Sequence, residues 1–179
     1  MSSAQILIAV TETAVFFKIL GRANFNLSAH FKSAIAELQS RGHRRFVLDL
    51  SECESMDSTF LGTLSAWAIQ LESESGREGV LPIELWNPNE RITSLLDDLG
   101  VKHLFRICAP ERIGIDFQAA PTGPVSREIL SQTSLEAHQT LMAVDPANIP
   151  RFKDVVAFLR EDLARLKSPA GGTGHRETS

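Results

Sequence analysis

The sequence is poor in cysteine, and this narrows the kinds of site that it can form. Of its 179 residues only Cys53 and Cys108 are cysteines, and they are far apart. Their separation excludes a CxxC motif and argues against a disulfide framework or a zinc site. We expect two reduced thiols in the interior, where free cysteine is common. The five histidines show no close ligand spacing either, so we expect neither a metal nor a cofactor.

Long apolar runs and an excess of positive charge are also missing. The longest early apolar run, Ile6 to Val10, is too short for the core of a signal peptide, and no basic segment precedes it. Nothing approaches the roughly 20 apolar residues that span a bilayer. The net charge of -4 lacks the basic excess typical of nucleic-acid binders. The sequence therefore predicts a cytoplasmic protein with no nucleic-acid partner and no membrane contact.

What is present suits a globular domain, because 43% of the residues are hydrophobic and 22% are charged. Residues 46–50 are almost continuously apolar, which is typical of a strand covered on both faces. Strands and helices alternate along the chain, which predicts crossover connections and a mixed, largely parallel sheet with helices packed on it, an α/β fold. The expected strands are 5–10, 14–20, 46–50, 82–86 and 104–108, and the expected helices are 27–40, 58–74 and one between Asn89 and Gly100.

The composition changes after Cys108. Residues 110–133 contain several prolines and little periodicity, and we expect a linker or a wrapping arm there. Two helical stretches follow at 134–142 and 149–167, so we expect a C-terminal helical extension over 134–167. Residues 168–179 are glycine-rich and low in apolar content, and we expect a disordered tail. The apolar face of the last helix packs on its own domain or forms a homo-oligomer or partner contact.

One segment between the third expected strand and the second helix concentrates polar side chains. The turn 51–57 leaves a buried strand, and Asp57 and Ser58 stand where the helix begins. At a helix start, backbone N–H groups lack partners and the helix dipole favours negative charge. Taken alone, this pattern indicates ordinary helix capping.

The same segment resembles the signature of the STAS domain, the fold of bacterial anti-sigma factor antagonists. The family pattern reads D-L-S-x-[VL]-x-x-[MI]-D-S-[ST]-G-L-G, and the upstream residues 21–24 resemble the family's G-[ER]-[LA]-[DN] loop. The resemblance covers residues 5 to about 108 and implies a STAS-like domain over 1–109. The matching residues of the signature are Asp49, Leu50, Ser51, Met56, Asp57, Ser58, Thr59, Leu61 and Gly62.

The resemblance implies a non-enzymatic regulator of transcription. Such an antagonist binds an anti-sigma factor, a serine kinase of the histidine-kinase-like ATPase type, and phosphorylation of its serine abolishes binding. The matching phosphoacceptor is Ser58, with Thr59 as a second candidate. A phosphate adds about -1.5 to -2 charges, which a helix start tolerates but a dry interface does not. The implied partner-binding residues are Gly21, Asn24, Asp57, Ser58, Thr59, Phe60 and Gly62.

Two residues depart from the family pattern and keep an alternative open. Phe60 stands where the family has glycine, and its ring is expected to alter the surface beside Ser58. Asn24 stands where phosphorylated members commonly have aspartate. The alternative is a STAS-type structural subunit of a signalling scaffold or lipid-transporter complex without phospho-switching. A nucleotide sensor lacks a phosphate-binding loop, and a Ser58-based hydrolase lacks an identifiable histidine partner.

Overall fold

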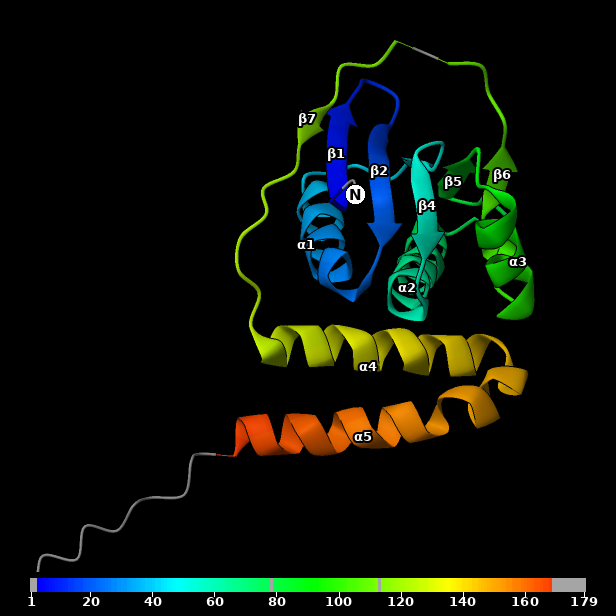
Figure 1. Ribbon diagram of the computed structural model, residues 1–179. Coiled ribbons are helices and arrows are strands. Elements are labelled where there is room, and N and C mark those ends of the chain that lie inside the picture. The colour runs from blue at the N-terminus through cyan, green and yellow to red at the C-terminus, as the bar shows by residue number, and fades with distance from the viewer. Residues whose placement is uncertain (1–2, 78, 113, 169–179) are drawn as a thin grey trace, which may run out of the picture.

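The computed structural model describes residues 3–77, 79–112 and 114–168, in which one sheet carries helices on its buried face (Figure 1). The strand order is β6-β5-β3-β2-β1-β7, and β4 pairs with β2 beside this path. The elements are β1 (Gln5–Val10), β2 (Val15–Ala23), α1 (Phe25–Ser40), β3 (Phe46–Asp49), β4 (Cys53–Met56), α2 (Ser58–Ser75), β5 (Ile83–Trp86), α3 (Glu90–Asp98), β6 (Arg106–Cys108), β7 (Gln118–Ala119), α4 (Arg127–Val144) and α5 (Ile149–Lys167), with short 3-10 helices at Lys102–Leu104 and Pro146–Asn148.

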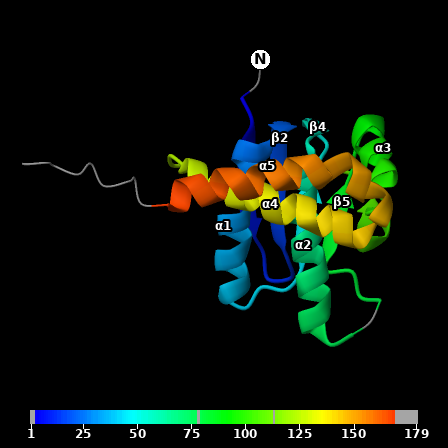
Figure 2. The ribbon, with the colours of Figure 1, turned by 90° about the horizontal axis from the view of Figure 1, so that it is seen from below.

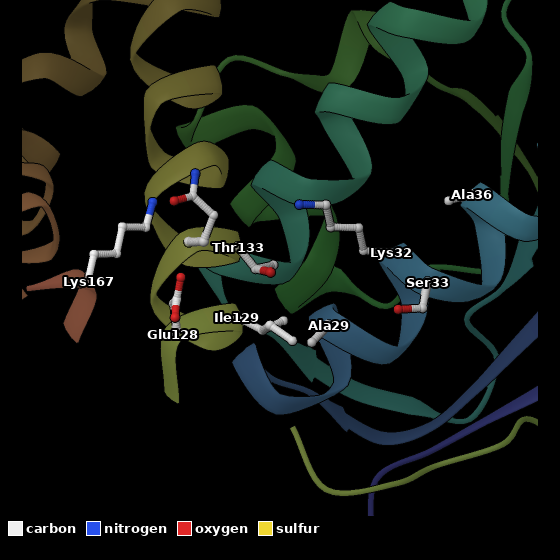
Figure 3. A pocket seen from close by; sticks show the side chains of 9 residues that line it. Ala29, Lys32, Ser33, Ala36, Glu128, Ile129, Thr133 and Lys167 are labelled. Atoms are coloured by element: carbon white, nitrogen blue, oxygen red, sulfur yellow. The ribbon is translucent and has the colours of Figure 1, made fainter. Parts of the chain in front are cut away.

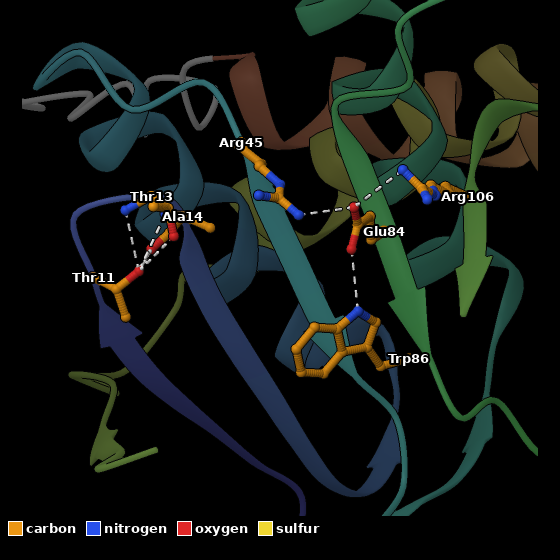
Figure 4. A network of polar contacts seen from close by, with 7 residues as sticks. All are labelled: Thr11, Thr13, Ala14, Arg45, Glu84, Trp86 and Arg106. Atoms are coloured by element: carbon orange, nitrogen blue, oxygen red, sulfur yellow. Dashed lines mark hydrogen bonds and ion pairs between the residues drawn. The ribbon is translucent and has the colours of Figure 1, made fainter. Parts of the chain in front are cut away.

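The pairing confirms the mixed, largely parallel sheet that the alternation of elements predicts. β1 and β2 form an antiparallel hairpin, whereas the β2–β3, β3–β5 and β5–β6 pairs are parallel. The hairpin turn is closed by Thr11, whose Oγ1 accepts from the amides of Thr13 and Ala14 (Figure 4). As expected for a strand covered on both faces, Phe46, Val47 and Leu48 are all fully buried.

Aromatic rings join the sheet to the helices that cover it. Phe17 of β2 stacks on Phe46 of β3 and meets Phe31 of α1 edge-on, with ring centroids 5.1 Å apart in the second pair. Phe31 in turn contacts Phe60 of α2 at 5.2 Å. Phe60 is wholly buried, so its ring belongs to the core and not to the surface beside Ser58. The large residue in place of the family's glycine therefore anchors α2 on α1.

Two short elements differ from the sequence expectation. Gly21 was expected to end the second strand, but β2 continues through it with a φ of +75° and a register shift. Glycine adopts this left-handed conformation without a steric penalty, so the strand bends without ending. The extension of β2 pairs with β4, which lies inside the expected turn 51–57.

The segment after β6 wraps around the domain. It passes from β6 at one edge of the sheet to β7, which pairs antiparallel with β1 at the other edge (Figure 1). Leu7 and Ile8 are the β1 residues in register with β7. The arm thus covers a strand edge that would otherwise present unpaired backbone groups.

The C-terminal helices form an antiparallel hairpin across the end of the domain where α1 and α2 begin (Figures 1 and 2). α4 begins at Arg127, earlier than the expected start at Ser134, because the Ser126 side chain accepts from the amide of Ile129 and caps it. Leu141 of α4 and Phe152 of α5 are part of the main core. The hairpin therefore packs on its own domain. Of the expected tail, residues 169–179 lie outside the described part of the chain.

A buried carboxylate links three parallel strands on the face of the sheet opposite the helices. Glu84 of β5 is only 8% exposed, and its Oε1 lies 3.0 Å from Arg45 Nη2 and 4.0 Å from Arg106 Nη1 (Figure 4). Its other oxygen accepts from the Trp86 indole at 3.2 Å. Trp86 also meets Phe16 edge-on. The arginines thus compensate a charge that burial would otherwise destabilise.

We predict that Arg45→Met lowers the free energy of unfolding by about 1–2 kcal/mol, because it leaves the Glu84 charge with only the more distant arginine. Urea denaturation followed by circular dichroism measures the change. Arg44→Met is the matched control, since Arg44 is exposed and contacts only backbone carbonyls among its described partners. Equal stability of the two variants would show that the Glu84 contacts do not stabilise the sheet.

Candidate functional site

The turn from β4 into α2 presents the residues that the sequence singled out. Asp57 is the N-cap of α2, and its Oδ1 accepts from the amide of Phe60 at 2.8 Å. The backbone N–H of Asp57 donates to the carbonyl of Ala23, at the end of β2. Asn24 follows directly and caps α1 through the amide of Leu27. The starts of α1 and α2 therefore lie together, held by the two parallel strands that precede them.

The two hydroxyls at the start of α2 are bound by α4. Ser58 Oγ lies 2.9 Å from His138 Nε2, and Thr59 Oγ1 lies 3.1 Å from Ser134 Oγ. Ser58 is half-buried and Thr59 is buried. Both hydroxyls are covered because the C-terminal extension lies over the end of the sheet where this turn is found.

The Ser134 carbonyl fixes the tautomer of His138. Its Nδ1 lies 2.7 Å from the carbonyl oxygen of Ser134, which can only accept, so Nδ1 carries the proton. In the neutral ring Nε2 then accepts from the Ser58 hydroxyl. Burial lowers the pKa of His138, and the Ser134 carbonyl and the nearby Asp57 carboxylate oppose this effect.

Burial also acts on the carboxylate that caps α2. It raises the pKa of Asp57, whereas the amide of Phe60, further backbone amides and His138 lower it. The amides at the start of α2 and α1 thus stabilise the Asp57 charge. Asp57, Ser58 and His138 thus place a carboxylate, a hydroxyl and a neutral imidazole side by side where α4 crosses the start of α2.

A close helix crossing positions α4 over α2. Gly62 of α2 packs on Ala137 of α4, and a Cβ added to Gly62 would lie 2.7 Å from the Ala137 Cβ and even nearer to its backbone oxygen. The glycine of the signature thus lets the two backbones approach. Beside the crossing, Lys32 of α1 forms an ion pair with Glu136 of α4 at 2.6 Å. Three of the predicted partner-binding residues, Ser58, Thr59 and Gly62, therefore already contact α4 of the same chain.

A cleft of about 380 Å³ remains beside Ser58 and gives it access to solvent. Phe25 of α1 and Phe158 of α5 lie at this cleft and are 48% and 58% exposed. Arg127 and Asp162 also line it and form an ion pair at 2.6 Å. The cleft thus combines apolar rings with a paired charge next to the hydroxyl.

The hydroxyl and imidazole pair was missing from the sequence analysis, which found no histidine for Ser58. The sequence signal that could have indicated this contact is the i, i+4 spacing of Ser134 and His138, which places both side chains on one helix face. A serine beside a neutral histidine suits nucleophilic chemistry. Acyl transfer also needs N–H donors aimed at the developing oxyanion, and the Phe60 amide points instead at Asp57. The pair therefore suits a binding or modification site better than acyl transfer.

Within the described residues, no group of three side chains could hold a metal ion. No described helix is long and apolar enough to cross a membrane. Cys53 and Cys108 are free thiols, as expected. Burial raises the pKa of Cys53 to about 11, and Cys108 is half-buried.

Residues 8–106 match the sequence model of a family described as Mlab, STAS domain. The chain belongs to the STAS-domain family. The match ends before the arm and the α4–α5 hairpin, so the family domain is the part that carries Asp57, Ser58 and Gly62. No curated protein matches the sequence.

Several solved structures are similar to this STAS domain. The NMR structure of the protein TM1081 has 21% identity and a TM-score of 0.50 over 57% of this chain and 78% of that chain. The crystal structure of this proposed anti-sigma factor antagonist from Thermotoga maritima gives 22% identity and a TM-score of 0.49 over 56% and 82%. The anti-sigma factor antagonist SpoIIAA in its unphosphorylated form gives 18% and 0.49 over 60% and 89%.

We predict that Gly62→Ala destabilises the protein by about 1–3 kcal/mol, because the added methyl group forces α4 away from α2. Thermal unfolding and urea denaturation measure the loss. Gly123→Ala in the arm is the matched control, since a Cβ there meets nothing within 4 Å. If Gly62→Ala were as stable as the control, the close crossing would not exist in solution.

We predict that the buried His138 makes stability depend on pH near neutrality. The pKa of His138 is lowered in the folded protein, so below the unfolded value of about 6.5 the unfolded state binds more protons. This contribution is fully present above that value and is lost as the pH falls towards the folded pKa. Urea denaturation between pH 7.5 and 5.5 should show a smaller loss in His138→Gln than in the natural protein.

His103→Gln is the control for this pH series, because His103 is exposed on the 3-10 helix Lys102–Leu104. It should keep the pH dependence of the natural protein. An unchanged pH dependence in His138→Gln would contradict the assignment of a neutral, buried imidazole.

Proposed function

We propose that this STAS protein is a non-enzymatic anti-sigma factor antagonist that binds a serine kinase of the histidine-kinase-like ATPase type. The observation that carries the proposal is the Asp57-Ser58-Thr59 sequence at a strand-to-helix turn, with Ser58 reachable through a cleft. The likeness of the domain fold to TM1081 is consistent with this class of protein. In this proposal the docking face comprises the starts of α1 and α2.

Phosphorylation of Ser58 is the proposed switch. Ser58 is the first residue of α2, where the helix dipole favours an added negative charge. The added dianion lies beside the Asp57 carboxylate, so burying both in a dry interface would be costly. Thr59 is the weaker candidate because it is only 6% exposed and its hydroxyl contacts Ser134. Phosphorylation would thus prevent docking without unfolding the domain.

A second candidate function is a structural subunit of a larger assembly without phospho-switching. The observation that favours it is the contact of the Ser58 hydroxyl with His138 of the same chain. A serine whose hydroxyl contacts another helix of the same chain suits a structural role as well as a switch. We further propose that the STAS domain spans 1–109 and that the arm and the helical extension follow it, with the extension beginning at Arg127, where α4 starts, and not at the expected 134. A homo-oligomer formed through the C-terminal helices stays a prediction.

We predict that Ser58→Asp weakens binding to the anti-sigma kinase at least tenfold and that Ser58→Ala retains it, because only the first adds charge to the interface. Isothermal titration of the purified kinase encoded in the same genome measures both affinities. Ser73→Asp, on an exposed position near the other end of α2, is the matched control and should bind normally. Equal binding of the Asp and Ala variants of Ser58 would favour the structural subunit.

A further inference from the structure

The α4–α5 hairpin has a small core of its own. Leu135, Val156, Leu159 and Leu163 form a hydrophobic cluster separate from the main one. Asp162 of α5 adds polar contacts to α4, because its oxygens accept from Arg127 at 2.6 Å and from Ser131 at 2.9 Å. These contacts lie within the hairpin, so they would persist if it moved away from the STAS domain.

The hairpin is anchored most firmly at its turn. The Asn148 amide donates to the carbonyls of Leu99 and Leu141, and Leu141 is fully buried in the main core. Asp145 packs against Gly100, where a Cβ would lie 3.1 Å from the Asp145 Cβ. These contacts tie the turn to the end of α3. They form a natural pivot for the two helices.

The contacts of α4 with the starts of α1 and α2 are of another kind. They include the Gly62 crossing, the hydrogen bonds to Ser58 and Thr59, and the Lys32–Glu136 ion pair, whose side chains are 37% and 45% exposed. An ion pair at such exposure stabilises weakly. This part of α4 is thus held partly by polar contacts, whereas the turn end is anchored in the main core through Leu141.

One feature of the structure destabilises the packed position of α4 against α1. A pocket of about 500 Å³ separates α1 from α4, lined by Lys32, Glu128 and Thr133 among others (Figure 3). Thr133 is only 2% exposed, yet its hydroxyl has no hydrogen-bond partner among the described residues. A buried hydroxyl without a partner is destabilising. Movement of α4 away from α1 would return this group to water.

We propose that the hairpin is an intramolecular substitute for the binding partner: it pivots about its turn and uncovers a helix-binding face that a partner helix then occupies in place of α4. The inference rests on the proposed function, because the face that α4 covers carries Ser58. Docking then depends on opening of the hairpin as well as on the phosphorylation of Ser58.

The chemistry of α4 indicates which partner helix fits. Opposite Gly62 the helix needs a small residue, as Ala137 is here, because the backbones approach too closely for a larger one. At the next position along the helix it needs a side chain that accepts from the Ser58 hydroxyl, as His138 does. An acidic residue beside Lys32, in the place of Glu136, completes the match. The expected occupant is an amphipathic helix with these three features.

The pivoting is tested by hydrogen–deuterium exchange of the full chain. We expect the amides of the first half of α4 to exchange faster than those of β3, through an opening that does not unfold the domain. Thr133→Val should slow this exchange about fivefold by removing the unpaired hydroxyl. Glu136→Lys should speed it roughly threefold by repelling Lys32, while the matched charge reversal Glu161→Lys, at an exposed position of α5, leaves it unchanged. Exchange of α4 only together with β3 would overturn the proposal.

The docking face is tested with a disulfide that locks the hairpin. Thr59→Cys with Ser134→Cys places two thiols where the hydroxyl oxygens are 3.1 Å apart, close enough for a disulfide after a small shift. We expect the oxidised protein to bind the anti-sigma kinase at least tenfold more weakly than the same variant when reduced. Thr59→Cys alone, which cannot form the lock, measures the effect of the substitution itself on binding.

Each other outcome of the locking experiment is decisive. Equal binding of both forms would place the docking face elsewhere and overturn this inference while leaving the proposed function intact. Binding by neither form, in a chain whose α4 opens by exchange, would overturn the proposed function and the docking role together. A dimer that forms only on reduction would show that a second copy, not a foreign helix, occupies the face.

Discussion

The close approach of α4 to α2 at Gly62 and Ala137 governs the environment of the whole site. A side chain at position 62 would hold the helices apart, and His138 would then not reach Ser58. With the backbones in contact, one helical turn of α4 supplies partners for two hydroxyls of α2. The small residue that the STAS signature contains therefore acts here in packing, and it couples the extension to the domain.

The environment of Ser58 follows from several effects that act together. The helix start favours negative charge, burial opposes it, and the Asp57 carboxylate adds like charge close by. Burial lowers the pKa of His138 and favours its neutral form, whereas the Ser134 carbonyl and the Asp57 carboxylate oppose this effect. A phosphate, a partner or a movement of α4 would each change this balance. The site thus responds to added charge and to how far it is accessible, and the position of the C-terminal extension sets that accessibility.

The sheet and the C-terminal extension are stabilised by different contacts. Buried aromatic rings and the Glu84 network fix the strands, so the turns that begin α1 and α2 stand on a rigid base. The hairpin adds its own hydrophobic cluster and a firmly anchored turn to this base. Its further contacts with the domain include the Gly62 crossing and the hydrogen bonds to Ser58 and Thr59. The network that fixes the sheet and the proposed regulatory element are therefore located in different parts of the chain.

Patterns local in sequence determined the strands, the helices on them and the place of Ser58 at a helix start, because apolar periodicity and capping residues act over a few positions. They did not determine that β2 continues through Gly21, that Phe60 is core, or that His138 meets Ser58. These depend on contacts between residues up to 80 positions apart. The β2 extension pairs with β4 and Phe60 packs on Phe31, whereas His138 reaches Ser58 only when α4 packs across the domain. The amphipathic pattern of the C-terminal helices showed that they must cover something, but only the tertiary structure decided which surface, because the pattern records an apolar face and not its partner.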